Sequence, residues 1–275
     1  MMRKRTDTLN EGGCYSPRVP WAFTLIELLV LLLMTCLFAM LLLPALARTN
    51  PNPKWTICRN NLRTLGTAFA LYANENRDYL PFPNWDGGST FNGKIVPGWL
   101  YTATNGSIPD PGPGGAYANN PAAAYATGLW FPYIRQPRAY LCPVGAESST
   151  YAARGLRNNR LSTYIANGAP CGFGLTSNFR TSCRTTEVWS PRCYMLWEPD
   201  ENEVGPGIPG PFVFNDGAAF PSGAEGIGRL HSRAGADILC TGGQVEFVSF
   251  PRFKQESEAA GKSLAWWNPF SSSGH

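Results

Sequence analysis

The chain has 275 residues, enough for one large domain or two small ones, and a hydrophobic content of 44% supports a packed core. Its 29 glycines and 24 prolines predict a loop-rich domain with short strands and exclude a simple helical bundle. The formal net charge of +4 is too weak a bias for a nucleic-acid partner.

Residues 1–22 form a basic leader segment, with four basic residues against two acidic ones. The apolar stretch that follows has no charged side chain from Leu28 to Ala47. A helix of about 20 residues spans a hydrocarbon core of ~30 Å, so residues 23–48 are expected to form a transmembrane helix. Positive charge before the span places the N-terminus in the cytoplasm and the bulk of the chain outside.

Glu27 stands just inside the N-terminal edge of this apolar stretch. An ionised carboxylate in hydrocarbon costs about 2.5–3.5 kcal/mol on insertion scales, so it normally has a partner. From the residues alone, the segment is either an uncleaved anchor with a lone acid near the interface or a helix whose acid pairs with another molecule.

The run FTLIELL, from Phe23 to Leu29, resembles the N-terminal methylation motif of type IV pilins and type II secretion pseudopilins. In that family a prepilin peptidase removes a basic leader, the new N-terminal amine is methylated, and the glutamate meets the amine of a neighbouring subunit. The resemblance implies cleavage between Ala22 and Phe23, methylation of Phe23 and an assembly role for Glu27. Ala22 stands where the family usually has glycine.

Two further stretches resemble a large bacterial subfamily of prepilin-type proteins. The run from Cys58 to Asn76 looks like the second helical part of that subfamily. The subfamily also has a motif of His, nine residues and Asp-Gly. Here His231 is followed by nine residues and then by Thr241 and Gly242, so the glycine is kept and the aspartate is replaced.

Residues 49–80 are expected to form a hinge and an amphipathic helix. Pro51 and Pro53 break or kink the helix there, because proline lacks a backbone donor and restricts the residue before it. Beyond them, apolar residues recur at steps of four and three, which predicts one stripe packed on the globular domain. The stripe residues are Cys58, Leu62, Leu65, Phe69 and Tyr72.

Residues 81–275 are expected to form a β-rich globular domain. The stretch 81–128 is dense in glycine, proline and aromatic residues and has almost no periodicity, which predicts long loops. Its aromatic residues either form a sugar-stacking surface or, in the preferred interpretation, pin the loops to the sheet as small local cores. These residues, with one just beyond the stretch, are Trp85, Trp99, Tyr101 and Trp130.

Strands are expected at residues 140–142, 162–166 and 193–197, and the clearest signal is a hairpin of residues 236–240 and 244–250. The connection Thr241-Gly242-Gly243 supplies the positive φ that a tight turn demands. The predicted fold class is therefore α+β. A long N-terminal helix, kinked near the two prolines, packs on a small antiparallel sheet with long Gly/Pro-rich loops.

Six cysteines follow the apolar stretch: Cys58, Cys142, Cys171, Cys183, Cys193 and Cys240. An even number in an oxidising compartment predicts up to three disulfides of open pairing, with free buried thiols as the alternative. A zinc site would need scattered thiolates, because there is no CxxC pair and the only histidines are His231 and His275. No metal site is therefore expected among them.

No catalytic signature is found: G-x-S-x-G, the phosphate loop, the dinucleotide fingerprint and HExxH are all missing from the sequence. His231 is expected to bond to nearby backbone rather than to act in a triad. The acidic run at residues 198–203 offers Glu198, Asp200 and Glu203 to Ca²⁺, although such a loop is normally just solvated. We therefore expect no enzyme and no resident cofactor.

Two functions remain open. The preferred one is a pseudopilin subunit with a single inner-membrane pass and a periplasmic domain, assembled into a type II secretion or type IV pilus-like filament. Its partners would be prepilin peptidase, copies of itself or other pilin-like subunits, the inner membrane and the secretion or pilus machinery. The alternative is a membrane-anchored periplasmic binding domain, for carbohydrate, that uses the same anchor without polymerising.

Overall fold

The computed structural model describes residues 24–48, 53–85, 90–91, 94–104, 106–147, 159–174, 182–200, 216–222 and 225–275. The chain divides into two compact units, Met1–Asn50 and Pro51–His275. Each unit is described by itself.

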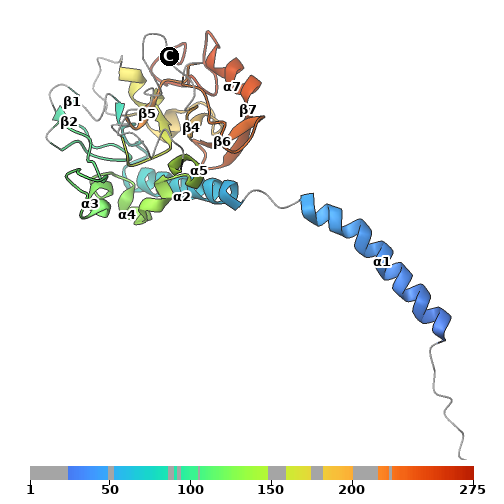
Figure 1. Cartoon of the computed structure of the whole chain (residues 1–275). Helices are drawn as coiled ribbons and strands as arrows, with labels where there is room; N and C mark the ends of the chain where they lie inside the picture. The colour runs from blue at the N-terminus through green and yellow to red at the C-terminus, as the bar shows by residue number, and fades with distance from the viewer. Residues whose placement is uncertain are drawn as a thin grey trace, which may run out of the picture. The chain divides into compact units, whose positions relative to one another are not determined.

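The first unit contains one helix, α1 (Leu25–Arg48), among the residues that are described (Figure 1). Its described large apolar residues are exposed over half of their surface or more, from 50% at Val30 to 81% at Leu25. In the described part of the chain, no helix combines the length and the apolar character that a membrane crossing requires.

The second unit is built from short elements. Its helices are α2 (Pro53–Glu75), α3 (Pro121–Tyr125), α4 (Phe131–Ile134), α5 (Pro143–Ala146) and α7 (Phe250–Ser257), with 3₁₀ helices η2 (Pro137–Tyr140), η3 (Ala169–Gly174) and η4 (Thr185–Glu187). Its strands are β1 (Thr90–Phe91), β2 (Lys94–Ile95), β3 (Ile165–Asn167), β4 (Tyr194–Trp197), β5 (Ala218–Ala219), β6 (Gly235–Cys240) and β7 (Val245–Ser249).

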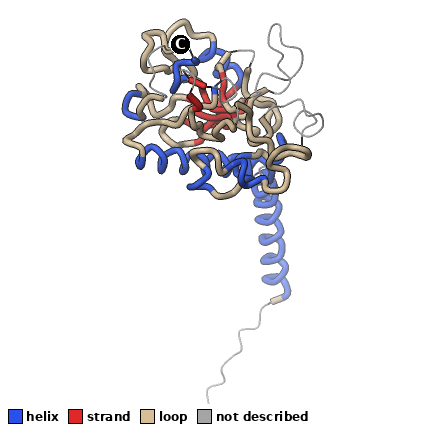
Figure 2. The backbone as a smooth tube through the Cα atoms, turned by 90° about the vertical axis from the view of Figure 1, so that its left-hand side faces the viewer, coloured by secondary structure: helices blue, strands red, loops and turns tan. Residues whose placement is uncertain are grey.

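Five of the described strands form one sheet in the order β5-β3-β4-β6-β7, while β1 and β2 pair separately. Figure 2 shows the strands in the interior of this unit, with helices and loops around them. Strand β5 runs parallel to β3, and the other neighbours in the sheet are antiparallel. The α+β class is therefore confirmed, but the prediction of a purely antiparallel sheet is wrong. The two-residue strand β5 is too short to leave an alternation signal.

The predicted hairpin is confirmed as β6 and β7, with Asp237 opposite Phe247. Its turn contains Gly243 at φ +85°, a left-handed conformation that favours glycine. The strand predicted at residues 193–197 is β4, and the one at 162–166 is shifted to β3. The strand predicted at residues 140–142 is wrong. Pro137 and Pro143 stand at the N-terminal ends of η2 and α5, where proline's fixed φ suits helical turns.

Helix α2 presents the predicted apolar stripe to the sheet. Its buried residues are Cys58, Leu62, Leu65, Gly66, Ala68, Phe69 and Ala73, and Tyr72 is half-buried. The helix contacts β6 and β7, as well as η2, α4 and α5. A Cβ at Gly66 would lie 2.8 Å from Leu239, so the glycine permits the close approach of α2 to β6. Helix α1 ends at Arg48 and α2 begins at Pro53, and Pro51, one of the two residues of the predicted hinge, lies outside the described residues.

Three polar side chains fix the first turns of α2 to β6. Asp237, whose side chain is 6% exposed, accepts two hydrogen bonds from Arg59, at 2.9 and 2.6 Å. The indole of Trp55 donates a third hydrogen bond to the same carboxylate, at 2.6 Å. This carboxylate therefore sets where the helix begins on the sheet.

Replacing Asp237 by alanine is expected to destabilise the chain by about 1–3 kcal/mol, because Arg59 and Trp55 lose their acceptor at a partly buried site. Urea unfolding followed by circular dichroism measures the effect. Asp237→Asn, which retains one acceptor oxygen, is expected to lose less. Equal midpoints for Asp237→Ala and the wild type would mean that this contact does not hold α2.

The aromatic residues of the long loops belong to the core. Trp99, Tyr101 and Trp130 have no exposed surface, and the rings of Trp99 and Trp130 lie 5.0 Å apart. Trp85 is half-buried and packs edge-on against Phe173. The prediction that these rings pin the loops to the sheet is confirmed, but Trp99, Tyr101 and Trp130 do so as part of the main core and not as small local cores.

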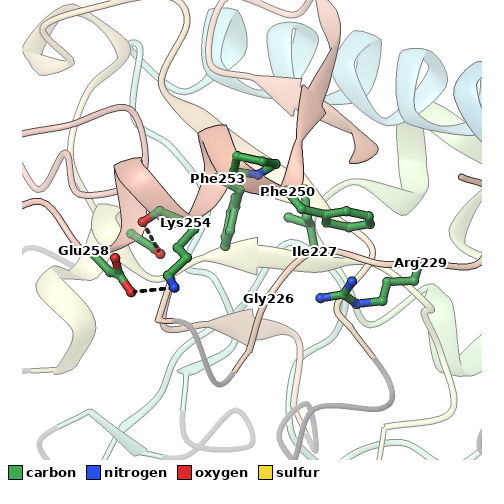
Figure 3. Close-up of a pocket in the computed structure, with 9 residues that line it drawn as sticks. Gly226, Ile227, Arg229, Phe250, Phe253, Lys254 and Glu258 are labelled. Carbon is green, nitrogen blue, oxygen red and sulfur yellow. Dashed lines mark hydrogen bonds and ion pairs between the residues drawn. The ribbon is translucent and has the colours of Figure 1, made fainter. Parts of the chain in front are cut away.

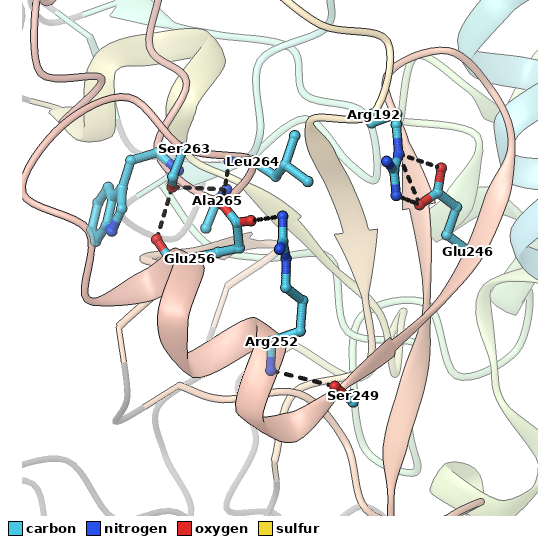
Figure 4. A network of polar contacts seen from close by, with 9 residues as sticks. Arg192, Glu246, Ser249, Arg252, Glu256, Ser263, Leu264 and Ala265 are labelled. Carbon is cyan, nitrogen blue, oxygen red and sulfur yellow. Dashed lines mark hydrogen bonds and ion pairs between the residues drawn. The ribbon is translucent and has the colours of Figure 1, made fainter.

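A polar network holds the segment that follows α7 (Figure 4). The carboxylate of Glu256 pairs with Arg252 at 2.5 Å and accepts a hydrogen bond from the backbone of Leu264 at 2.8 Å. The hydroxyl of Ser263 donates to the carbonyl oxygen of Glu256 at 2.7 Å. In this way the C-terminal segment lies against the sheet, where Trp267 is fully buried.

Candidate functional site

The start of α1 contains the first candidate site, at Glu27. Oε2 of Glu27 accepts hydrogen bonds from the backbone nitrogen of Thr24 at 2.9 Å and from its hydroxyl at 2.8 Å. The backbone nitrogen of Glu27 donates back to the Thr24 hydroxyl at 3.3 Å. This reciprocal pattern is a capping box, which satisfies helix donors that would otherwise have no partner. Ala22 and Phe23, the predicted processing junction and methylation site, lie outside the described residues.

A second candidate site lies inside the globular unit. Four metal-ligating side chains meet there from four separate segments, and we refer to them as the donor cluster: Cys58, Cys142, Glu198 and His231. Cys58 lies in α2, and Cys142 is the residue before α5. Glu198 is the residue after β4, and His231 lies in the segment before β6.

The donor cluster is compact and buried. Nε2 of His231 lies 3.0 Å from Sγ of Cys142 and 3.1 Å from Oε2 of Glu198. The donor atoms of all four residues lie within 4.8 Å of one another. The His231 side chain is 8% exposed, and the other three residues are buried. Among the described residues, neither Nδ1 of His231 nor Oε1 of Glu198 has a hydrogen-bond partner.

Neighbouring groups fix the positions of the two thiols. Sγ of Cys58 shares a hydrogen bond of 3.0 Å with the hydroxyl of Tyr164. Sγ of Cys142 accepts from the backbone nitrogen of Gly145 at 3.3 Å, and the backbone nitrogen of Cys142 donates to Thr163 at 2.7 Å. Both sulfurs are therefore oriented by the fold itself.

Burial and mutual hydrogen bonds shift the pKa values of the titratable groups in the donor cluster. Burial raises the pKa of the Cys58 thiol, whereas the hydrogen bond from Cys58 lowers the pKa of Cys142. Burial alone would lower the pKa of His231, but its contacts with Cys142 and Glu198 raise that pKa to about 10. Without a metal, a protonated His231 would therefore stand between two acidic groups.

The donor cluster differs from a catalytic triad. In a triad the nucleophile and the acid bind opposite nitrogens of the imidazole. Here Cys142 and Glu198 both face Nε2 of His231, and Nδ1 has no partner among the residues that the structure describes. Cys142 also has no exposed surface through which a substrate could reach it.

No protein-family model, no curated protein and no solved structure matches this chain. The interpretation of both sites therefore depends on their residues and their geometry.

The two ends of the predicted His motif lie at opposite ends of β6. His231 precedes the strand and belongs to the donor cluster, whereas Thr241 and Gly242 form the turn after it. Thr241 and Gly242 donate backbone hydrogen bonds to the carbonyl oxygens of Cys193 and Pro191, at 2.9 and 2.7 Å. The expectation that His231 bonds to nearby backbone is wrong, because its contacts are side chains from distant segments.

The six cysteines proposed for disulfides are all buried. Among the described residues, no disulfide joins any of the six. Sγ of Cys171 donates a hydrogen bond to the carbonyl oxygen of Gly168 at 3.2 Å. The pairing of these residues in an oxidising compartment stays a prediction.

Two of the three calcium candidates are described by the structure, and they face different groups. Glu198 faces His231, and Asp200 forms an ion pair with Arg229. Glu203 lies outside the described residues. The two described carboxylates therefore serve different neighbours.

A pocket of about 570 Å³ lies beside α7 (Figure 3). Its wall combines the rings of Phe250 and Phe253 with the cationic groups of Arg229 and Lys254. The guanidinium of Arg229 lies 4.4 Å from the centre of the Phe250 ring, and Lys254 lies 3.8 Å from Glu258. No sequence signal indicates this pocket, since its residues belong to no motif.

No sequence pattern indicates that the four residues of the donor cluster meet. Each member had been singled out for another reason: the thiols as disulfide candidates, His231 as part of a motif and Glu198 as part of an acidic run. Zinc ligands are usually recognised by short spacings within one segment. In this chain no two of the four ligands come from the same segment, so spacing carried no signal.

Proposed function

We propose that this chain is a pilin-like structural subunit that is processed before Phe23 and assembles through α1 into a secretion or pilus-type filament. The observation that carries the proposal is α1 itself, a 24-residue helix whose described large apolar side chains are all exposed. A helix that is apolar on every side needs a cover, either lipid or other helices. The family resemblance of the run from Phe23 to Leu29 supports neighbouring copies as that cover.

The division of the chain supports the same proposal. The globular unit has its own buried core and sheet, so α1 is not needed to complete it. A subunit of a helical filament requires both parts: a helix for the filament core and a domain that folds around its own residues. The inner-membrane location and the partners of this proposal rest on the sequence of residues 23–48.

Processing gives the first test. Co-expression with a prepilin peptidase is expected to shorten the chain by its first 22 residues, as measured by intact mass and N-terminal sequencing. Ala22→Gly, which restores the usual junction residue, is expected to be processed at least as completely as the wild type. If both the wild type and Ala22→Gly keep their first 22 residues when the peptidase is present, the proposal is refuted.

Shearing gives the second test. A filament subunit is expected to leave sheared cells in a high-mass fraction when the assembly machinery is present. Cleavage without any sheared polymer would instead favour an anchored binding domain. The pocket beside α7 would then be the candidate ligand site, because Trp99, Tyr101 and Trp130 have no exposed surface on which a sugar could stack.

A further inference from the structure

The donor atoms of the donor cluster converge on one point. A tetrahedral zinc ion, with bonds of about 2.0–2.3 Å to oxygen, nitrogen and sulfur, keeps its ligand atoms roughly 3.3–3.8 Å apart. In the structure Nε2 of His231 lies 3.0 and 3.1 Å from the nearest atoms of Cys142 and Glu198. All four donor atoms fall within 4.8 Å of one another. An ion could therefore enter with small outward shifts of the side chains.

The types of the donors select the metal. Two thiols, one imidazole and one carboxylate are the ligand types that zinc uses in tetrahedral sites. Calcium and magnesium prefer oxygen ligands, and Cu(I) prefers thiolate and thioether sulfur over a carboxylate. The set therefore fits zinc better than the calcium considered for Glu198 and Asp200.

The donor cluster also contains buried polar atoms without a hydrogen-bond partner, and a bound cation would supply one. Buried polar atoms in native proteins nearly always have a partner, and a buried charge without one is costly. The Glu198 side chain is only 9% exposed, and its Oε1 has no hydrogen-bond partner among the described residues. Cys142 and Glu198 both lie at Nε2 of His231. This is where one ion could bind all three groups, whereas a proton relay would place one group at each ring nitrogen.

We propose that the donor cluster binds one zinc ion. With four protein ligands and almost no exposed surface, the site is closed, and its role is structural rather than catalytic. The ion would join α2, the turn before α5, the end of β4 and the segment before β6. It would thereby tie the first half of α2 to the sheet, next to the contact between Asp237 and Arg59. The proposal is independent of filament assembly.

Metal content tests the proposal. The whole chain is purified without a tag, in detergent micelles, from zinc-supplemented cells. It is expected to hold about one zinc ion per molecule, as measured by inductively coupled plasma mass spectrometry. His231→Ala and Cys142→Ser are expected to lose it. The matched controls His275→Ala and Cys183→Ser, which change the same residue types outside the cluster, are expected to retain it.

Cobalt substitution keeps the test informative where a variant fails to fold. The wild-type chain loaded with Co²⁺ is expected to show the thiolate-to-cobalt charge-transfer band and the strong visible bands of tetrahedral coordination. A wild-type chain that takes up neither zinc nor cobalt would overturn the proposal. So would a Cys58–Cys142 disulfide in the zinc-supplemented protein, or full zinc content in folded His231→Ala.

Discussion

Replacing Trp99 by alanine is expected to lower the free energy of unfolding by about 3–5 kcal/mol, a large part of the stability of an ordinary domain. The side chain of Trp99 has no exposed surface, and its ring lies 5.0 Å from that of Trp130 and 6.0 Å from that of Tyr140. Its indole nitrogen donates a hydrogen bond of 2.9 Å to the carbonyl oxygen of Gly217. The substitution would remove the packing and leave that carbonyl without this donor.

Denaturant unfolding of the whole chain in micelles, followed by far-ultraviolet circular dichroism, measures this effect without relying on tryptophan fluorescence. The control is Trp189→Ala, because Trp189 is 51% exposed and its loss is expected to change stability by less than about 0.5 kcal/mol. If both variants unfold at the same midpoint as the wild type, the long loops do not share the core of the sheet.

The burial of Trp99 could not be predicted from the sequence. Its stretch has almost no periodicity, so only long loops could be predicted, with local cores as the preferred role for the aromatic residues. In the structure Trp99 is buried beneath the loops. One buried residue is enough to anchor a loop, and it needs no periodic pattern in the residues that flank it. Burial of this kind depends on segments far away in the sequence, such as that of Gly217, and leaves no local pattern.

The elements that could be predicted are those whose pattern lies within one segment. Leu62, Leu65 and Phe69 repeat with the period of a helix, and α2 buries all three. Likewise, the two glycines after Thr241 identified the turn between β6 and β7, because only a few residue types adopt positive φ readily. Local sterics and periodic burial are readable from sequence.

The donor cluster could not be predicted for the opposite reason. His231 and Cys58 come from segments that the sheet brings together, and neither spacing nor composition indicates that they meet. Even the nine-residue interval after His231 has a structural explanation, since it holds strand β6 and the short segment before it. The interval sets His231 and the Thr241 turn at opposite ends of one strand, so the motif does not form one site.

Glu27 is the position at which the structure changes the design of an experiment. From the sequence, its carboxylate needs a partner, and the structure supplies one within the chain, the capping box with Thr24. Alanine at this position would remove both the cap and the charge, so its effect on assembly would be ambiguous. Glutamine can complete a capping box with threonine, and it carries no charge.

Glu27→Gln is therefore expected to leave processing intact and to reduce the sheared high-mass fraction by tenfold or more. Without the carboxylate, the amine of a neighbouring Phe23 would stay unpaired in a low-dielectric core, at a cost of about 3–5 kcal/mol. Quantitative blotting of sheared and cell-bound protein measures the ratio. The control is Glu258→Gln, at the exposed residue that follows α7. Normal assembly of Glu27→Gln together with failure of Glu27→Ala would mean that Glu27 only caps the helix. Loss of processing in Glu27→Gln would instead place its role at the peptidase, before any contact between subunits.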